Sequence, residues 1–218
     1  MLEITMRAPE VIYDLLNVSL SGWKIAPKEF STDPQIEVVH DGKFSVCSSS
    51  YSGTRPHSDF INALNEVLIA VAYSVRQAKP DYSLVHAAAL EIDGRKVVYF
   101  GRSKSGKSRY AAMRCVAGAR CLADDLLLYS SKGGYFETLG LPIRMRRPLP
   151  DDLLNAIDSK KILVGHSLCY LPNAAVSIAP AGQIFVADDL LAFDHNYQPQ
   201  PWALSRQHEL VSQFVIEG

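Results

Sequence analysis

Residues 96–108, KVVYFGRSKSGKS, decide the fold class that this sequence predicts. The apolar run at their start is typical of a strand, and residues 107–117 read as a helix. Between the two, residues 101–108 fit the pattern G-x-x-x-x-G-K-[ST] without gaps. A strand, a glycine-containing loop and a helix in this order predict an α/β fold, which we expect to be a mixed β-sheet with flanking helices and a phosphate-binding loop (P-loop).

The loop pattern predicts contacts to a nucleotide. Glycines allow backbone N–H groups to turn toward phosphate oxygens, and the positive end of the following helix faces the same anion. Lys107 is expected to contact the β- and γ-phosphates of ATP, and the Ser108 hydroxyl to bind Mg²⁺. The alternative is a strand–turn–helix with an incidental lysine and serine. The residues expected at the nucleotide are Gly101, Arg102, Ser103, Lys104, Ser105, Gly106, Lys107, Ser108 and Arg109.

Length and composition limit the remaining possibilities. The chain has 218 residues, a net charge of -1 and 48% hydrophobic residues, which suits one sizeable domain or a domain with a smaller elaboration. The near-neutral charge gives no support to binding of nucleic acid or of a membrane. No apolar run is long enough for a transmembrane helix, and the first residues lack the pattern of a signal peptide. Four cysteines without a C-x-x-C pair suit reduced thiols in a cytoplasmic protein.

Apolar periodicity and turn residues predict the surrounding elements. Hairpins are expected around the Asp-Gly pairs at 41–42 and 93–94. A long helix with Ser58 as its N-cap should follow the first hairpin. We interpret residues 1–80 as an N-terminal elaboration with this hairpin and helix, packed on a core formed by residues 81–218. Further expected elements are strands around residues 132–134, a short helix after Pro150 and a closing helix near the C-terminus.

The motif ADDLL occurs twice, with its acids at Asp124-Asp125 and at Asp188-Asp189. The first copy follows Ser108 after one helix, one turn and one short strand. A parallel neighbour strand would therefore end beside the loop and place these acids at the carboxyl edge of the sheet. We expect Asp124 to accept the proton of an attacking hydroxyl and Asp125 to bind Mg²⁺, although the order can be reversed. For the second copy we favour a cap or turn, because no phosphate-binding element lies beside it.

A histidine and an arginine cluster are the other candidates for the site. Pairing of the second hairpin would bring His86 near the phosphate end of its partner strand, where it could hydrogen-bond an aspartate; otherwise it is structural. Arg144, Arg146 and Arg147 form either a solvated basic face or a group that neutralises a transferring phosphoryl group or an acidic substrate. On a strand, Arg144 and Arg146 would share one face, which makes them the better candidates.

The order of these motifs resembles a known family. HAAALEIDGRKVVYFGRSKSGKS, a helix and then CLADDLLLY are similar to the catalytic domain of HPr kinase/phosphorylase and its relatives, a family distantly similar in fold to phosphoenolpyruvate carboxykinase. The resemblance covers residues 84–130 well and residues 140–200 loosely. It implies that His86 and Asp124 form an acid–base pair, that Asp125 serves the metal, and that the reaction is ATP-dependent phosphorylation of serine.

The sequence also departs from this family. It has Lys104 where these kinases usually carry glycine, and Arg109 where the HPr enzymes tend to have glutamate. We find no segment like their glycine-rich signature linked to dephosphorylation, and residues 1–80 do not resemble their regulatory domain. Shorter relatives phosphorylate other hydroxyls, including serine in lasso-peptide precursors and free serine, and relatives often assemble into homo-oligomers.

We therefore expect a cytoplasmic kinase that uses ATP and Mg²⁺ to phosphorylate a serine hydroxyl of a peptide or protein. The first alternative is a small-molecule kinase, for example of free serine. The second is a nucleotide-binding sensor that transfers no phosphate to a substrate. A GTPase is disfavoured, since no N-K-x-D motif occurs.

Overall fold

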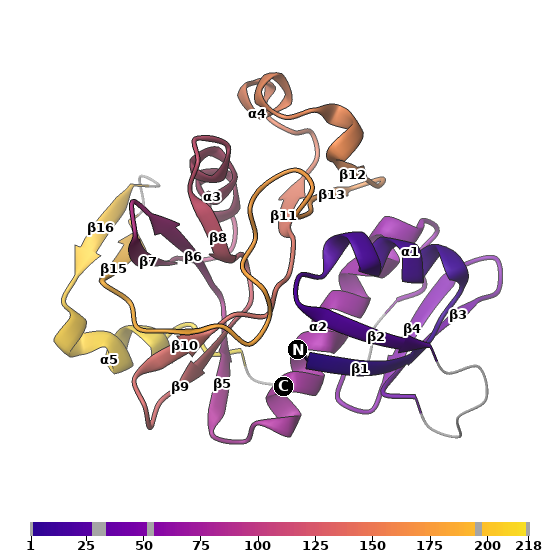
Figure 1. The fold of residues 1–218 in the computed structure, drawn as a ribbon, viewed down its shortest axis with the longest axis horizontal. Coiled ribbons are helices and arrows are strands. Elements are labelled where there is room, and N and C mark those ends of the chain that lie inside the picture. The colour runs from indigo at the N-terminus through magenta and orange to yellow at the C-terminus, as the bar shows by residue number, and fades with distance from the viewer. Residues whose placement is uncertain (1, 28–33, 52–54, 195–197, 217–218) are drawn as a thin grey trace.

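The computed structural model describes residues 2–27, 34–51, 55–194 and 198–216. Within these ranges the chain is a mixed α/β structure, rich in strands and with few helices (Figure 1). The mixed α/β class predicted from the sequence is confirmed. The prediction of a single mixed sheet is wrong, because the described strands are divided among four sheets.

The largest sheet carries the strand that leads into the 101–108 loop. Its order is β16 (Pro199–Trp202), β15 (Asp189–Phe193), β7 (Arg95–Phe100), β6 (Ala87–Ile92) and β8 (Arg120–Ala123). The second expected hairpin is confirmed as the antiparallel pair β6/β7, with Asp93 and Gly94 both at positive φ in the turn. The parallel neighbour of β7 is β15. The expectation that the strand before Asp124 would adjoin β7 is therefore wrong: β8 runs in the same direction as β7, but β6 lies between them.

A second sheet continues two of these strands. Its order is β14 (Ile184–Phe185), β10 (Tyr135–Glu137), β9 (Leu127–Ser130) and β5 (Tyr82–Val85). His86 alone separates β5 from β6, and residues 124–126 separate β8 from β9. Because β5 pairs with β9 and β6 pairs with β8, both antiparallel, the two segments bend together from one sheet into the other. This shared bend is one reason why the strands do not form one sheet. The strands expected around residues 132–134 are β9 and β10.

The helix that begins at the end of the 101–108 loop packs between strands of the largest sheet and the elements around residues 143–156. This helix, α3 (Lys107–Val116), contacts β6 and β8 and ends before Gly118, whose φ of 104° suits a helix stop. It also contacts β11 and α4, the short helix expected after Pro150. The remaining elements of this region are β11 (Ile143–Arg146), α4 (Asp151–Ala156), η1 (Ser159–Lys161), β12 (Leu163–Val164) and β13 (Leu168–Leu171), of which the strands pair in the order β11-β13-β12.

The N-terminal segment has a sheet and two helices of its own. Its elements are β1 (Leu2–Arg7), α1 (Glu10–Ser19), β2 (Trp23–Pro27), β3 (Ile36–His40), β4 (Phe44–Ser48) and α2 (Phe60–Ala78), with the strand order β2-β1-β3-β4. The expected hairpin is β3/β4 and the expected long helix is α2. The N-cap of α2 is Asp59 and not Ser58, because the Asp59 carboxylate accepts a hydrogen bond from the backbone N–H of Asn62 at 2.9 Å.

Helix α2 joins the N-terminal segment to the rest of the chain (Figure 1). It contacts β3 and β4 as well as β5 and β13. Its buried apolar residues belong to one hydrophobic cluster with Leu84, Leu128, Leu139 and Tyr170. The N-terminal segment thus packs on the region after residue 80 through a shared core, while a domain boundary at that point stays a prediction.

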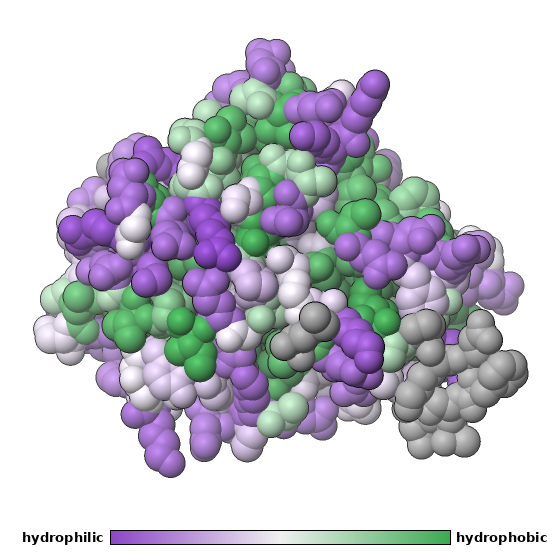
Figure 2. All heavy atoms as spheres, viewed as in Figure 1, coloured by the Kyte–Doolittle hydropathy of each residue, from purple (hydrophilic) through white to green (hydrophobic). Residues whose placement is uncertain are grey.

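The C-terminal residues close the structure near the bend. The expected closing helix is α5 (Gln207–Ser212), which follows η2 (Leu204–Arg206). Beyond α5, the carbonyl oxygen of Phe214 accepts a hydrogen bond from the backbone N–H of His86 at 2.9 Å. Figure 2 shows hydrophilic residues spread over the viewed face, with smaller hydrophobic areas between them. None of the helices in the described ranges is both long and apolar enough to cross a membrane.

Candidate active site

The loop between β7 and α3 depends on its two glycines. Gly106 has a φ of 89°, a left-handed conformation that few side chains adopt readily. A Cβ atom on Gly101 would lie 2.6 Å from the Oγ of Ser105, so this position has no room for a side chain. Helix α3 starts at Lys107, and the first N–H groups of a helix have no partner within it. The loop and this helix end therefore form a surface that suits an anion.

Lys107 folds back over the loop. Its ammonium group donates to the carbonyl oxygens of Gly101 at 2.6 Å and Arg102 at 3.3 Å. Burial lowers the pKa of Lys107, while the nearby carboxylates of Asp125 and Asp124 favour its charged form. The loop thus holds a buried cation close to both acids.

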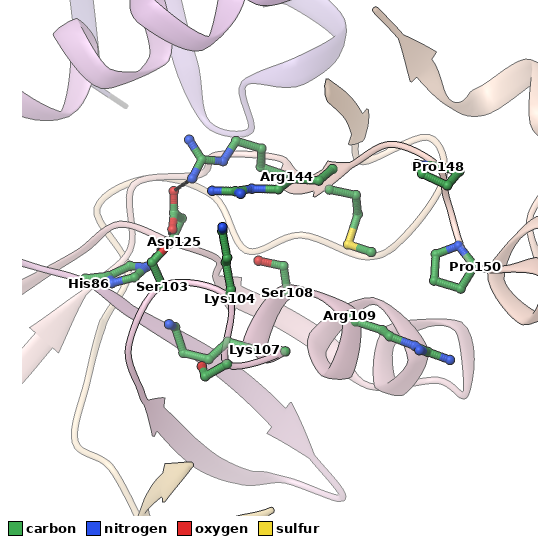
Figure 3. A pocket seen from close by; sticks show the side chains of 14 residues that line it. His86, Ser103, Lys104, Lys107, Ser108, Arg109, Asp125, Arg144, Pro148 and Pro150 are labelled. Atoms are coloured by element: carbon green, nitrogen blue, oxygen red, sulfur yellow. Dashed lines mark ion pairs between the residues drawn. The ribbon is translucent and has the colours of Figure 1, made fainter. Parts of the chain in front are cut away.

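Lys104 adopts an unusual backbone conformation for a residue with a side chain. Its φ is 69°, in the left-handed region that costs a non-glycine residue about 1–2 kcal/mol. Figure 3 shows its side chain pointing from the loop toward Arg144 and Asp125. Strained backbone of this kind tends to occur at functional sites, because elsewhere nothing compensates its cost.

A cavity of about 240 Å³ lies above this loop. It is bounded by residues of the loop, of α3, of β11 and of the bend between the sheets. The lining residues are His86, Ser103, Lys104, Ser105, Gly106, Lys107, Ser108, Arg109, Asp125, Arg144, Met145, Arg146, Pro148 and Pro150. Most of the residues predicted for the site therefore meet at one cavity. Gly101, Arg102 and Asp124 do not line it.

Asp124 is buried behind the cavity, with 2% of its surface exposed. Its Oδ2 accepts a hydrogen bond from the backbone N–H of Arg144 at 2.9 Å, and its Oδ1 is buried without a partner among the described residues. Burial and the charge of Asp125 raise the pKa of Asp124 to about 6, although the Arg144 N–H and the Ser108 hydroxyl favour the charged form. The Oδ1 of Asp124 thus forms no hydrogen bond within the usual distance of any described residue, although the Ser108 hydroxyl lies close enough to Asp124 to affect its pKa.

Asp125 faces the cavity and joins a histidine to an arginine (Figure 3). Its Oδ1 lies 2.8 Å from the Nε2 of His86, and its Oδ2 pairs with the guanidinium of Arg144. Burial opposes ionisation, but the His86 hydrogen bond and the Arg144 charge hold the pKa of Asp125 below its ordinary value. The predicted contact of His86 with an aspartate is present, but the partner is Asp125 and not Asp124.

The three arginines of the basic cluster do not all point the same way. As predicted from the alternation of side chains on a strand, two of them share one face and the third does not. Arg144 and Arg146 lie on β11 and line the cavity. Arg147 donates to the carbonyl oxygen of Gly165 at 2.9 Å and does not line the cavity. Arg109 also lines it, but pairs with Asp152 at 3.0 Å and extends along α3 away from Asp125 (Figure 3). Arg144 and Arg146 are thus the two arginines of this cluster that line the cavity, and Arg144 is paired there with Asp125.

The second ADDLL copy lies away from the cavity. Asp189 pairs with Arg95 at 2.8 Å, and Asp188 accepts a hydrogen bond from the backbone N–H of Lys96 at 2.7 Å. These contacts are at the first residues of β7, whereas the 101–108 loop follows its last residue. Asp188 directly precedes β15 and Asp189 is its first residue, so both acids make their contacts at the start of β7 in the sheet, and the cap or turn expected for them is not what Asp189 forms.

Sequence reasoning missed the contribution of α2. Asn65 contacts Arg144 and Tyr170, and it lines a small hollow of about 20 Å³ on the other side of Asp124 and Asp125. The one signal in the sequence is a polar residue between buried apolar ones in this part of α2. Such a residue is common in amphipathic helices and does not by itself predict a site.

The oxygen atoms near Ser108 suit a magnesium ion shared with phosphate. Within the described residues, no three His, Cys, Asp or Glu side chains form a group that could hold a metal alone. Mg²⁺ commonly takes one or two protein oxygens and completes its shell with phosphate oxygens and water. The Ser108 hydroxyl and the unpartnered Oδ1 of Asp124 fit that requirement.

The comparison with protein-family models gave no match for this chain, and the search of curated proteins gave none either.

Proposed function

We propose that this protein is a kinase that uses ATP and Mg²⁺ to phosphorylate a serine hydroxyl of a peptide or protein, in the manner of HPr-kinase-like enzymes. The observation that carries this proposal is the position of Asp125, which lies in the same cavity as Lys107, Ser108 and the start of α3. Phosphoryl transfer requires a phosphate-binding surface and a carboxylate on opposite sides of the reacting group.

The loop would bind the triphosphate of ATP as a P-loop does. Backbone N–H groups at the start of α3 and the ammonium group of Lys107 would contact the phosphate oxygens. The ammonium group of Lys107 now donates to two backbone carbonyl oxygens. On nucleotide binding it would exchange these hydrogen bonds for stronger, charge-assisted ones to phosphate oxygens. Lys104 and Arg146 have no ion-pair partner in the described part of the chain, so both are free to meet phosphate.

The geometry favours the reversed order of the two acids. Ser108 and the free Oδ1 of Asp124 would hold Mg²⁺, which supplies positive charge at the phosphate oxygens. Asp125 lines the cavity and is held by His86, so it is better placed to meet an acceptor hydroxyl. We therefore assign the base to Asp125, with His86 orienting it, and the metal side to Asp124.

The proposed reaction is an in-line displacement. The acceptor oxygen forms a bond to the γ-phosphorus while the bond from that phosphorus to the bridging oxygen of ADP breaks, and ADP keeps the electron pair. The hydroxyl proton passes to the Asp125 carboxylate. Because the pKa of Asp125 is lowered, its carboxylate is ionised at neutral pH and is in the form that can accept this proton. Lys107, Arg144 and Arg146 stabilise the charge on the phosphoryl oxygens.

Mass spectrometry of acceptors after incubation with ATP and Mg²⁺ tests this proposal. A pool of serine-containing peptides and, separately, free serine should be incubated with wild type, Asp125→Asn and Lys107→Ala. We expect wild type to add one phosphate to a peptide, with threonine- and alanine-substituted peptides as controls. Transfer to free serine alone would indicate a small-molecule kinase. ATP binding without any phosphorylated product, or equal transfer by Asp125→Asn, would contradict the proposed reaction.

A further inference from the structure

Arg144 is held from two sides by two parts of the chain. Its Nη2 atom pairs with Oδ2 of Asp125 in the cavity. Its Nη1 atom donates to Oδ1 of Asn65 at 2.9 Å. Asn65 belongs to α2 in the N-terminal segment, whereas Arg144 and Asp125 belong to the region after residue 80. A planar guanidinium with a partner on two of its nitrogen atoms has little freedom to rotate.

The Asn65 side chain is itself oriented by a second donor. The Tyr170 hydroxyl donates to the same Oδ1 at 3.0 Å, and Tyr170 is the direct partner of Arg144 across β11 and β13. Tyr170 is buried, which raises its pKa and keeps it a hydroxyl donor. Two donors at one oxygen fix which end of the amide faces Arg144, because its NH₂ group could accept neither hydrogen bond.

We propose that Asn65 is a positioning residue that holds the Arg144 guanidinium against Asp125 in the phosphoryl-transfer site. This role rests on the proposed function of the cavity. With this role, helix α2 contributes a side chain to the site in addition to packing against the rest of the chain. A neutral amide at this position orients Arg144 without adding a second negative charge beside the one that Asp125 already supplies. A carboxylate at the same place would satisfy the same donors but would compete for that charge.

Two substitutions at Asn65 separate orientation from charge. Asn65→Leu keeps the branching and the number of heavy atoms and removes the acceptor, whereas Asn65→Asp keeps the acceptor and adds a charge. We expect Asn65→Leu to lower kcat for ADP formation with the serine-peptide pool about 10- to 100-fold, with KM for ATP changed less than about threefold. Asn65→Asp should raise KM for ATP as well, because Arg144 then attracts phosphate less strongly.

Asn62→Leu is the matched control on the same helix. The Oδ1 of Asn62 accepts a hydrogen bond from the Ser167 hydroxyl at 3.2 Å, and Asn62 lines neither the cavity nor the hollow beside Asp125. The same change of side chain there should leave kcat within about twofold of wild type. An equal loss of rate in both variants would mean that α2 acts only through general stability, and would overturn the proposal.

A double-mutant cycle with Arg144→Ala tests whether Asn65 acts through Arg144. If it does, Asn65→Leu should cause no further loss of kcat in the Arg144→Ala protein. Multiplicative losses in an active wild type would overturn the role of Asn65 while leaving the proposed function intact. A wild type that binds no ATP and forms no ADP would instead overturn the proposed function, and the role of Asn65 with it. Thermal unfolding of the same four proteins, without nucleotide, measures separately whether the two side chains interact.

Discussion

Arg144 contacts Asp124 through its backbone and Asp125 through its side chain. The Arg144 N–H donates to Oδ2 of Asp124 at 2.9 Å, while the guanidinium pairs with Oδ2 of Asp125. One residue of β11 thereby positions both members of the acidic doublet. The two contacts can be separated by mutation, because removal of a side chain leaves the backbone N–H in place.

We predict that Arg144→Ala loses activity but keeps the fold. The hydrogen bond to Asp124 remains, so the melting temperature should stay within a few degrees of wild type. The rate of phosphoryl transfer should fall about 10²- to 10³-fold, as for the loss of one group that stabilises transition-state charge. Arg144→Lys should recover part of the rate, since a lysine keeps the charge but cannot reach Asp125 and Asn65 together. An unchanged rate in Arg144→Ala would contradict this role.

Asp124→Asn should stabilise the protein at high pH. The folded-state pKa of Asp124 is raised from 3.8 to about 6, so its contribution to stability is fully present below pH 3.8 and is lost as the pH rises through 6. At pH 8 the wild type carries a penalty of up to about 3 kcal/mol that the amide lacks. Urea unfolding at pH 4, 6 and 8 should show an advantage of Asp124→Asn that grows with pH.

Asp125→Asn provides the control of opposite sign. The pKa of Asp125 is lowered in the folded protein, so its contribution is present above its ordinary pKa and is lost as the pH falls through the lowered value. This variant should therefore be less stable than wild type at neutral pH, and the difference should shrink in acid. The same sign for both variants would contradict the environments described for the two acids.

Substitutions at Lys104 should separate backbone strain from charge. Lys104→Gly removes the cost of a φ of 69° and should raise the free energy of unfolding by about 1 kcal/mol. Lys104→Ala keeps that cost and should not stabilise the protein. Both variants lose the cation and should bind ATP about tenfold more weakly, as measured by calorimetry. Unchanged ATP affinity in both would show that Lys104 does not contact phosphate.

Gly101→Ala should damage the loop by a steric clash. The new Cβ would lie 2.6 Å from the Ser105 Oγ, so the loop must move. We expect ATP affinity to fall at least about tenfold, since backbone N–H groups would leave their positions. Ser105→Ala in the same protein removes the clashing oxygen and should restore part of the affinity. No recovery would mean that the loop shift has another cause.

Asp189→Asn tests the second acidic doublet. The Arg95–Asp189 pair is exposed, with 41% of the Asp189 side chain accessible, so its loss should lower the free energy of unfolding by less than about 1 kcal/mol. Phosphoryl transfer should be unchanged, because this pair lies at the opposite end of β7 from the loop. A large loss of activity would contradict the structural interpretation of this copy.

Local patterns predicted the elements of this fold better than their arrangement. Residues 101–108, the Asp-Gly turns and the long helix carry their signals within a few residues, and the structure contains each of them. Strand order is not encoded locally, and so the insertion of β6 between β7 and β8 was missed. The partner of His86 was missed for a related reason. Which of two adjacent acids is buried can be predicted only when the positions of the neighbouring strands are known. Here Asp124 is buried and Asp125 is the more accessible acid, so His86 pairs with Asp125.

The shared bend of β5–β6 and β8–β9 sets the distance between His86 and Asp125. The β5–β6 segment passes from one sheet to the other at His86, and the β8–β9 segment passes at residues 124–126. The hydrogen-bonded ladders on either side fix how far apart these two crossings can be. The spacing of His86 and Asp125 is therefore determined by main-chain pairing over both flanks, without any hinge between them. An insertion of one residue on either chain would shift the register, and would separate this pair even if every side chain were kept.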